Sequence, residues 1–154
     1  MSDGSSERDS RPEWLNSFQV GLSADLVALD EQDPFRIAER GVRSFAAPVN
    51  TTPSIRLLYA ILSNAVIKGA NHALLLPGEH KLEVWYHLGR RWTLEVEPPH
   101  KLASSLTREL AAMCAPSGVV KVIAYTECSA YAVVRSRDTE HGIRSLVRLV
   151  DARH

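Results

Sequence analysis

Cysteine is scarce in this chain, and its histidines are not arranged to hold a metal. The 154 residues include two cysteines, Cys114 and Cys128. Two are too few for a disulfide framework and are typical of a protein from a reducing compartment. No two of the six histidines lie four residues apart, and the cysteines lack the spacing of a zinc site. The sequence therefore predicts no metal site.

An excess of charge of either sign is absent, and so are long apolar runs. The 18 basic and 18 acidic residues give a net charge of zero, which disfavours a dominant role in nucleic-acid binding. No run reaches the roughly 20 apolar residues that cross a bilayer, and the polar N-terminus lacks the apolar core of a secretory signal. We therefore expect no nucleic-acid partner, no membrane insertion and a cytoplasmic location.

The eight glycines are scattered and form no phosphate-binding loop. No stretch reads G-x-x-x-x-G-K-[ST], the pattern whose backbone N–H groups cradle nucleotide phosphates. Phosphoryl transfer also needs magnesium ligands and a residue that positions the nucleophile. We predict that the chain alone neither binds nor hydrolyses ATP, and that it has no catalytic residues and no cofactor.

Helical and strand patterns do follow one another along the chain, and they divide it into three parts. Residues 1–10 are rich in serine, glycine and charge and are expected to be disordered. Residues 11–50 are expected to be an N-terminal helical segment and linker, with a helix starting at Asp33-Pro34 and the linker beginning at Ser44. Residues 51–154 are expected to form an α+β domain.

The α+β domain begins with its clearest helix, which starts at Thr52 before a proline and stops at Gly69. A second helix is expected over residues 102–113. Patterns typical of strands cover residues 73–76, 82–88, 92–96, 119–125, 130–135 and 143–150. Because short connections favour antiparallel neighbours, the predicted fold is α+β: a largely antiparallel sheet of about six strands with helices packed on one face, plus N-terminal helices.

Residues 53–89 give this domain a family resemblance. They read PSIRLLYAILSNAVIKGANHALLLPGEHKLEVWYHLG. This resembles the domain that precedes the motor core in the bacterial hexameric ATPases of type II secretion and type IV pili, where a helix leads into the motif gASDIHIEP. Ala70 and Pro77 match, whereas the family's Asp, His and Glu fall on His72, Leu74 and Leu76. The resemblance implies a retained scaffold whose polar site has become apolar core.

A second match lies near the end of the chain. Residues 138–151, DTEHGIRSLVRLVD, are similar to the family's PT.HGEk.vlRlLd, with His141, Gly142, Arg148 and Asp151 on matching positions. In the family this domain acts by contacting a neighbouring subunit, and the motor core would follow it. The resemblance therefore implies a degenerate, stand-alone, ATPase-like domain that keeps a contact role.

Together these observations predict a non-catalytic protein-interaction or regulatory module. Its partner is expected to be a protein, such as a component of a secretion or pilus machine, and a homo-oligomer is left open. One alternative is a small-molecule sensing domain, for which polar groups should converge in a cavity between helix 53–69 and the sheet. The other is a small His/Cys enzyme, for which Cys128 should lie within hydrogen-bond reach of a histidine such as His141.

The residues predicted to bind the partner lie on the second hairpin. Its turn carries Arg90 and Arg91 and is followed by Trp92, and arginine and tryptophan are the residue types that most often anchor interfaces. Trp85, on the preceding strand, is a further candidate if its face is exposed. If a helix covers that face, Trp85 belongs to the core, and Trp92 has the same alternative.

Overall fold

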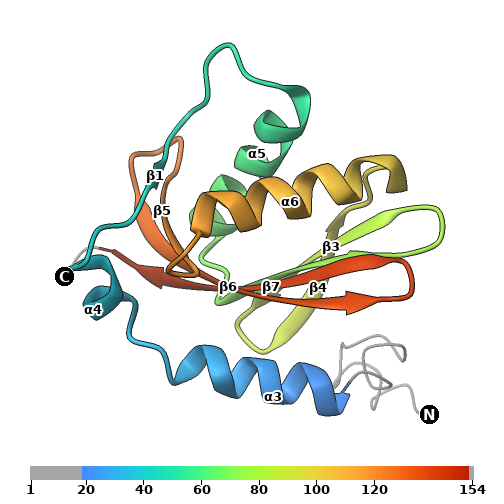
Figure 1. Cartoon of the computed structure of the whole chain (residues 1–154), viewed down its shortest axis with the longest axis horizontal. Coiled ribbons are helices and arrows are strands. Elements are labelled where there is room, and N and C mark those ends of the chain that lie inside the picture. The colour runs from blue at the N-terminus through green and yellow to red at the C-terminus, as the bar shows by residue number, and fades with distance from the viewer. Residues whose placement is uncertain (1–18, 153–154) are drawn as a thin grey trace.

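The computed structural model describes residues 19–152, which form a seven-stranded sheet with helices on both faces (Figure 1). The strand order is β1-β5-β6-β7-β2-β3-β4, and every neighbouring pair is antiparallel except β1 and β5. The strands are β1 (Ser44–Phe45), β2 (His72–Pro77), β3 (Leu82–Leu88), β4 (Arg91–Val96), β5 (Val119–Ile123), β6 (Ser129–Thr139) and β7 (Gly142–Asp151). The helices are α3 (Gln19–Asp30), α4 (Pro34–Ala38), α5 (Pro53–Lys68) and α6 (Ala103–Cys114).

Helix α5 is delimited by local signals at both ends. The Thr52 hydroxyl accepts a hydrogen bond from the Ile55 amide at 3.3 Å, and Pro53 occupies the first turn. At the other end Gly69 adopts a left-handed conformation with φ 74°, which a side chain would strain. Both signals were visible in the sequence, and the predicted helix is confirmed.

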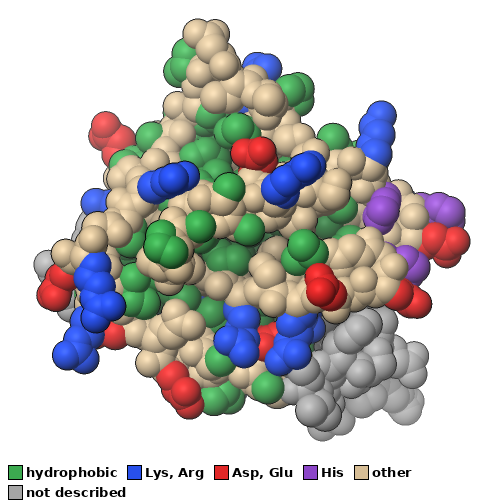
Figure 2. Space-filling view, viewed as in Figure 1, with side chains coloured by type: hydrophobic (Ala, Val, Ile, Leu, Met, Phe, Trp, Pro, Cys, Tyr) green, Lys and Arg blue, Asp and Glu red, His purple; other side chains and the backbone are tan. Residues whose placement is uncertain are grey.

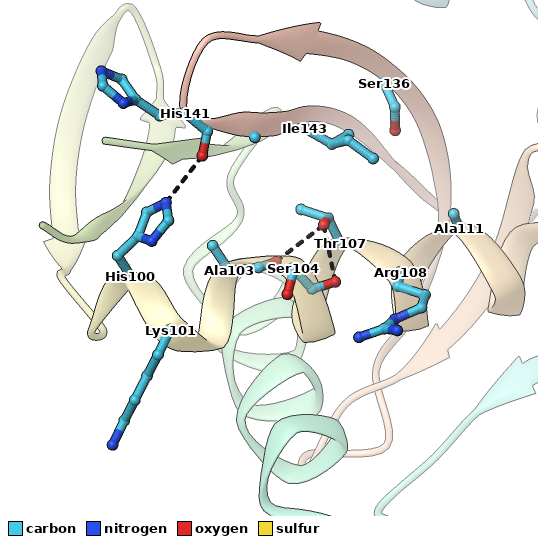
Figure 3. Close-up of a pocket in the computed structure, with 11 residues that line it drawn as sticks. His100, Lys101, Ala103, Ser104, Thr107, Arg108, Ala111, Ser136, His141 and Ile143 are labelled. Atoms are coloured by element: carbon cyan, nitrogen blue, oxygen red, sulfur yellow. Dashed lines mark hydrogen bonds between the residues drawn. The ribbon is translucent and has the colours of Figure 1, made fainter. Parts of the chain in front are cut away.

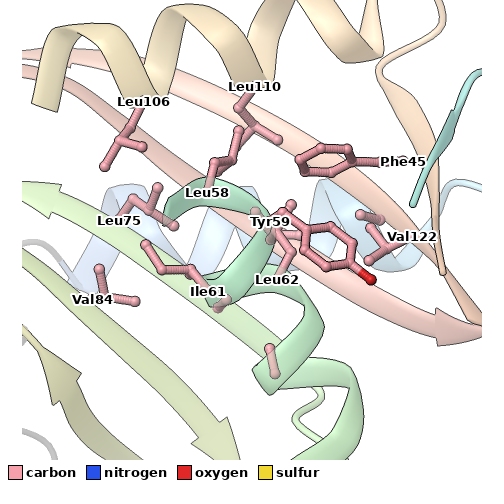
Figure 4. Close-up of a cluster of buried hydrophobic side chains, with 14 of the residues drawn as sticks. Phe45, Leu58, Tyr59, Ile61, Leu62, Leu75, Val84, Leu106, Leu110 and Val122 are labelled. Atoms are coloured by element: carbon pink, nitrogen blue, oxygen red, sulfur yellow. The ribbon is translucent and has the colours of Figure 1, made fainter. Parts of the chain in front are cut away.

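The larger core lies between the sheet and the α5–α6 layer (Figure 4). Leu58 and Leu62 on α5 and Leu106 and Leu110 on α6 are fully buried against the sheet. Burying each leucine contributes roughly 1.5–3 kcal/mol, so this layer holds the two helices in place. The hydroxyl of Tyr59 donates to the Ile123 carbonyl, which satisfies a polar group in the same layer.

The opposite face of the sheet is covered by α3, with α4 beside it (Figure 1). Leu22 and Leu29 of α3 are buried there. The sheet residues that pack in this second core are Leu74, Trp85, Trp92, Val119, Val133 and Leu146. The chain therefore has three layers, with the sheet in the middle.

The predicted fold class is confirmed, with differences in detail. The sheet has seven strands rather than about six, because the segment expected as a linker contains β1, which pairs with β5 through Ser44 and Phe45. The helix start at Asp33 is confirmed, since its carboxylate accepts from the amides of Phe35 and Arg36. The expected disorder of residues 1–10 lies outside the described residues.

Candidate functional site

The second hairpin, formed by β3 and β4, lies at the outer edge of the sheet. The turn between β3 and β4 consists of Gly89 and Arg90, with Gly89 at φ 63°. A two-residue turn with glycine first is typical of a type II′ hairpin, whose flanking residues exchange hydrogen bonds. Arg90 and Arg91 are both exposed here, as the sequence indicated for the turn.

The turn fixes the direction in which each backbone group of β4 points. Leu88 and Arg91 flank the turn, so hydrogen-bonded and non-hydrogen-bonded pairs alternate from there as far as Leu94, beyond which the register shifts at Glu95. The N–H and C=O groups of Arg91 and Thr93 therefore face β3, and those of Trp92 and Leu94 face the open edge. Since β4 is the last strand of the sheet, no described strand pairs with that edge.

Apolar side chains surround this open edge. Leu94 and Val96 are 38% and 45% exposed, although both belong to a strand. Beside them, the exposed side of α5 and β3 form a shallow groove of about 330 Å³. The groove is lined by Leu57, Ala60, Ile61, Asn64, Ile67, Tyr86, Val96 and Tyr125. An unpaired strand edge next to an apolar groove is typical of a surface that takes up a further strand.

The two tryptophans predicted as anchors lie in the second core. Trp85 is 8% exposed and Trp92 is 6% exposed, because α3 covers their face of the sheet. The indole N–H of Trp85 donates to Glu83 at 3.0 Å. Of the four residues proposed from the sequence, Arg90 and Arg91 are therefore the exposed ones, and the tryptophans support the hairpin from behind.

Two histidines continue the row of rings behind the hairpin. His72 pairs with His87 across the strands, and His87 packs on Trp92 with ring centroids 4.9 Å apart. Burial, reinforced by the charge of His87, lowers the pKa of His72 to about 4 despite the nearby Asp30. Both ring nitrogens of His72 lack a hydrogen-bond partner within the described part of the chain. This histidine is therefore neutral at pH 7 and behaves as core.

Beneath α3 lies a buried ion cluster. The Asp25 carboxylate is fully buried and accepts hydrogen bonds from Arg135 at 2.7 Å, from Arg137 at 2.8 Å and from Arg144. Burial alone would raise the pKa of Asp25, but the hydrogen bonds from Arg137 and Arg135 and the charge of Arg144 lower it overall. Burial lowers the pKa of Arg144, and Asp25 opposes that shift. The cluster fixes α3 to β6 and β7.

A further arginine holds the C-terminal end of α3. Arg148 donates to the carbonyls of Leu29 at 3.0 Å and Gln32 at 3.2 Å, and its Nε lies 3.5 Å from Asp30. These carbonyls belong to the last turn of the helix and the residues after it, where acceptors lack partners within the helix. The arginine that matched the family motif thus has a structural role in this chain.

A larger cleft, of about 600 Å³, lies between α6 and the β6–β7 hairpin (Figure 3). In Figure 2 hydrophobic side chains show between α6 and the sheet, and histidines gather at the right-hand end of the molecule. His100 is bonded to the His141 carbonyl at 2.9 Å, and the Thr107 hydroxyl donates to carbonyls of its own helix. Lys101 and Arg108 extend away from the hairpin (Figure 3). The polar groups of this cleft therefore do not converge on a common point.

Residues 19–152 show where the features named for the two alternative functions lie. Cys128 precedes β6 and His141 follows it, so the 11-residue strand separates them by about 35 Å. Burial raises the pKa of the Cys114 thiol to about 12, which leaves it protonated. Within residues 19–152 no three His, Cys, Asp or Glu side chains are grouped as a metal site. The groove beside α5, where a sensing domain should carry polar groups, is mainly apolar.

No helix in the described part of the chain is both long and apolar enough to cross a membrane. Comparison with models of known protein families and with curated proteins gives no match. The resemblance to secretion and pilus ATPases thus stays a prediction from the residue pattern.

Sequence reasoning missed the ion cluster, although part of its signal was present. Arg135 and Arg137 alternate on β6, and Arg144 lies directly opposite Arg137 on β7, so all three share one face. Period-two arginines on paired strands indicate an anionic partner on that face. The partner itself, Asp25, lies more than a hundred residues earlier in a helix, and no local pattern connects it to the strands.

Proposed function

We propose that this protein is a non-catalytic interaction module that binds a protein partner through the open edge of β4. The observation that carries this proposal is the unpaired edge itself, with Leu94 and Val96 exposed along it. Natural sheets usually protect a long apolar edge by covering it or by placing charges on it, because such an edge pairs readily with other chains. An edge left apolar in the middle is therefore a candidate contact surface.

Strand addition supplies both affinity and selectivity at such an edge. A partner strand would pair with the outward N–H and C=O groups of Trp92 and Leu94, and these main-chain bonds do not depend on its sequence. Its side chains on the helix face would lie over the groove that contains Ile67, 46% exposed, and Tyr125, 64% exposed. Apolar contact there would select the partner.

The setting of this module is proposed from the resemblance alone. We place it in the bacterial cytoplasm as an adaptor or regulator related to the secretion and pilus ATPases. The small-molecule sensing alternative has less support. The polar groups of the α6 cleft either form hydrogen bonds within the protein or extend away from the β6–β7 hairpin. Mg-ATP should give no heat of binding in isothermal titration, and micromolar binding would refute the prediction that the chain alone does not bind ATP.

Photo-crosslinking in cells tests the contact surface. We expect a photoreactive phenylalanine analogue introduced at Leu94 to give discrete protein adducts, which Val96→Lys on the same edge should abolish. Position 143 is a matched control, because Ile143 is also on a strand and is 40% exposed but lies on the β6–β7 hairpin. The analogue placed there should give no such adduct, and Ile143→Lys should leave the Leu94 adducts unchanged. Equal adducts from both positions, or none from Leu94, would exclude the β4 edge as the surface that binds the partner.

A further inference from the structure

We infer that the strand which pairs with the β4 edge is β4 of a second copy of this chain, antiparallel and centred on Thr93. This inference rests on the proposed function and names the partner of the same edge. Pairing the two edges would join two seven-stranded sheets into one continuous sheet across a two-fold axis.

The backbone of β4 is self-complementary about Thr93. The groups that face the open edge belong to Trp92 and Leu94, one residue on either side of Thr93. In an antiparallel pair centred on Thr93, Trp92 of one copy lies opposite Leu94 of the other. Each such pair exchanges two hydrogen bonds, and the two-fold axis creates two such pairs, so the dimer contact would contain four main-chain hydrogen bonds. Thr93 then faces its own symmetry mate in a non-hydrogen-bonded pair, where side chains lie closest.

The charges along β4 favour the same arrangement. The strand and its flanks read RRWTLEVE, with Arg90 and Arg91 at the start and Glu95 and Glu97 at the end. A parallel pair would place like charges together. The antiparallel pair centred on Thr93 places Arg91 opposite Glu95, where the register of β4 shifts. The Glu95 side chain is 10% exposed and already binds Lys68 at 2.6 Å, so Arg91 of the second copy would lie beside it as a second cation. Opposite charges across a strand pair are favourable, and like charges are not.

The side chains at the centre of the pair also fit. Leu94 is 38% exposed. Across the dimer contact it would meet Trp92 of the second copy, because Leu94 and Trp92 lie on the same face of β4. Thr93 is exposed and small enough to face a second threonine. The strand is short, six residues, so the contact would bury a small area and the dimer would be weak and concentration-dependent.

Disulfide trapping tests both the dimer and its register. In a Cys128→Ser background, Thr93→Cys should form a disulfide-linked dimer in oxidised glutathione. The matched control is Glu97→Cys, an exposed position on the same edge, which would lie four residues from the two-fold axis. We expect the Thr93→Cys dimer to form at least about tenfold faster, because pairing holds its two thiols at high effective concentration.

A charge reversal gives an independent readout without cysteine. In sedimentation of the full chain, Arg91→Glu should weaken the dimer and Arg91→Lys, which keeps the charge, should not; Glu95 is left unchanged because its carboxylate binds Lys68. Equal trapping rates for the two cysteine variants, or a wild-type chain that stays monomeric at millimolar concentration, would overturn the inference. The proposed function would survive that result if the Leu94 photo-adducts contained a different protein and no second copy of this chain, and it would fail with the inference if Leu94 gave no adduct.

Discussion

Replacing Asp25 with asparagine should destabilise the fold more than any other single change of similar size in α3. The substitution keeps the shape of the side chain but removes the charge that three arginines share. Arg135 and Arg137 have side chains 43% and 48% exposed, so they can turn to water. Arg144 is 4% exposed and cannot, so it would remain as an unpaired buried charge.

The expected magnitude follows from this difference between the arginines. Removing one partner of a buried ion pair costs about 3–5 kcal/mol. With two of the three arginines free to be solvated, we expect about 3 kcal/mol for Asp25→Asn, a large part of the 5–15 kcal/mol by which domains are typically stable. Arg135→Gln removes a half-exposed partner and should cost about 1 kcal/mol or less.

Urea unfolding followed by tryptophan fluorescence measures these changes, because Trp85 and Trp92 lie in the layer that α3 covers. Asp25→Asn combined with Arg144→Met should be more stable than Asp25→Asn alone, since the pair is then replaced by apolar contact. A loss below about 1 kcal/mol for Asp25→Asn, or no rescue by the second substitution, would refute the view that Arg144 needs this carboxylate.

The ion cluster also predicts a pH dependence. The folded-state pKa of Asp25 is lowered, so its contribution is fully present above the unfolded-state value of 3.8. The contribution is lost as the pH falls from there through the folded-state pKa. Asp25→Asn should lack this part of the acid unfolding curve, and an identical loss of stability below pH 3.8 in both proteins would contradict the assignment.

Three further results are expected. Leu74→Asp should lower the free energy of unfolding by several kcal/mol, because Leu74 is 1% exposed under α3, and an unchanged melting temperature would show that this site tolerates charge. The folded-state pKa of His72 is about 4 against 6.5 when unfolded, so stability should fall by up to about 3 kcal/mol as the pH drops through that window, and His72→Leu should flatten the urea midpoint across it. Replacing Arg90 and Arg91 with serine should change the free energy of unfolding by no more than about 0.5 kcal/mol while reducing the Leu94 photo-adducts, and unchanged adducts would remove the turn from the contact.

The elements of this fold that local signals specify could be predicted from the sequence. The caps at Thr52 and Gly69 bound α5, and the alternation in residues 82–88 gave β3, because both patterns depend on neighbours a few residues away. β1 could not be predicted in this way, because two residues carry no periodicity and their pairing with β5 depends on a segment more than 70 residues later.

The candidate site also has features that the local sequence predicts and features that depend on distant segments. The exposed turn at Arg90 and Arg91 was evident, since a glycine followed by two arginines interrupts two alternating strands. The burial of Trp85 and Trp92 was not, because it depends on α3 crossing the far face of the sheet. The open edge required the strand order, which no single segment encodes.

The long separation between α3 and its partners has a consequence for synthesis of the chain. Asp25 precedes Arg144 by 119 residues. At about 5–20 residues per second, a ribosome needs roughly 6–24 s to produce the arginine after the aspartate has been made. During that interval β2, β3 and β4 are made, but α3 lacks the completed strands β6 and β7 whose arginines bind Asp25. Completion of the β6–β7 hairpin then allows α3 to dock. The N-terminal helix therefore reaches its native contacts only after nearly all of the chain has been made.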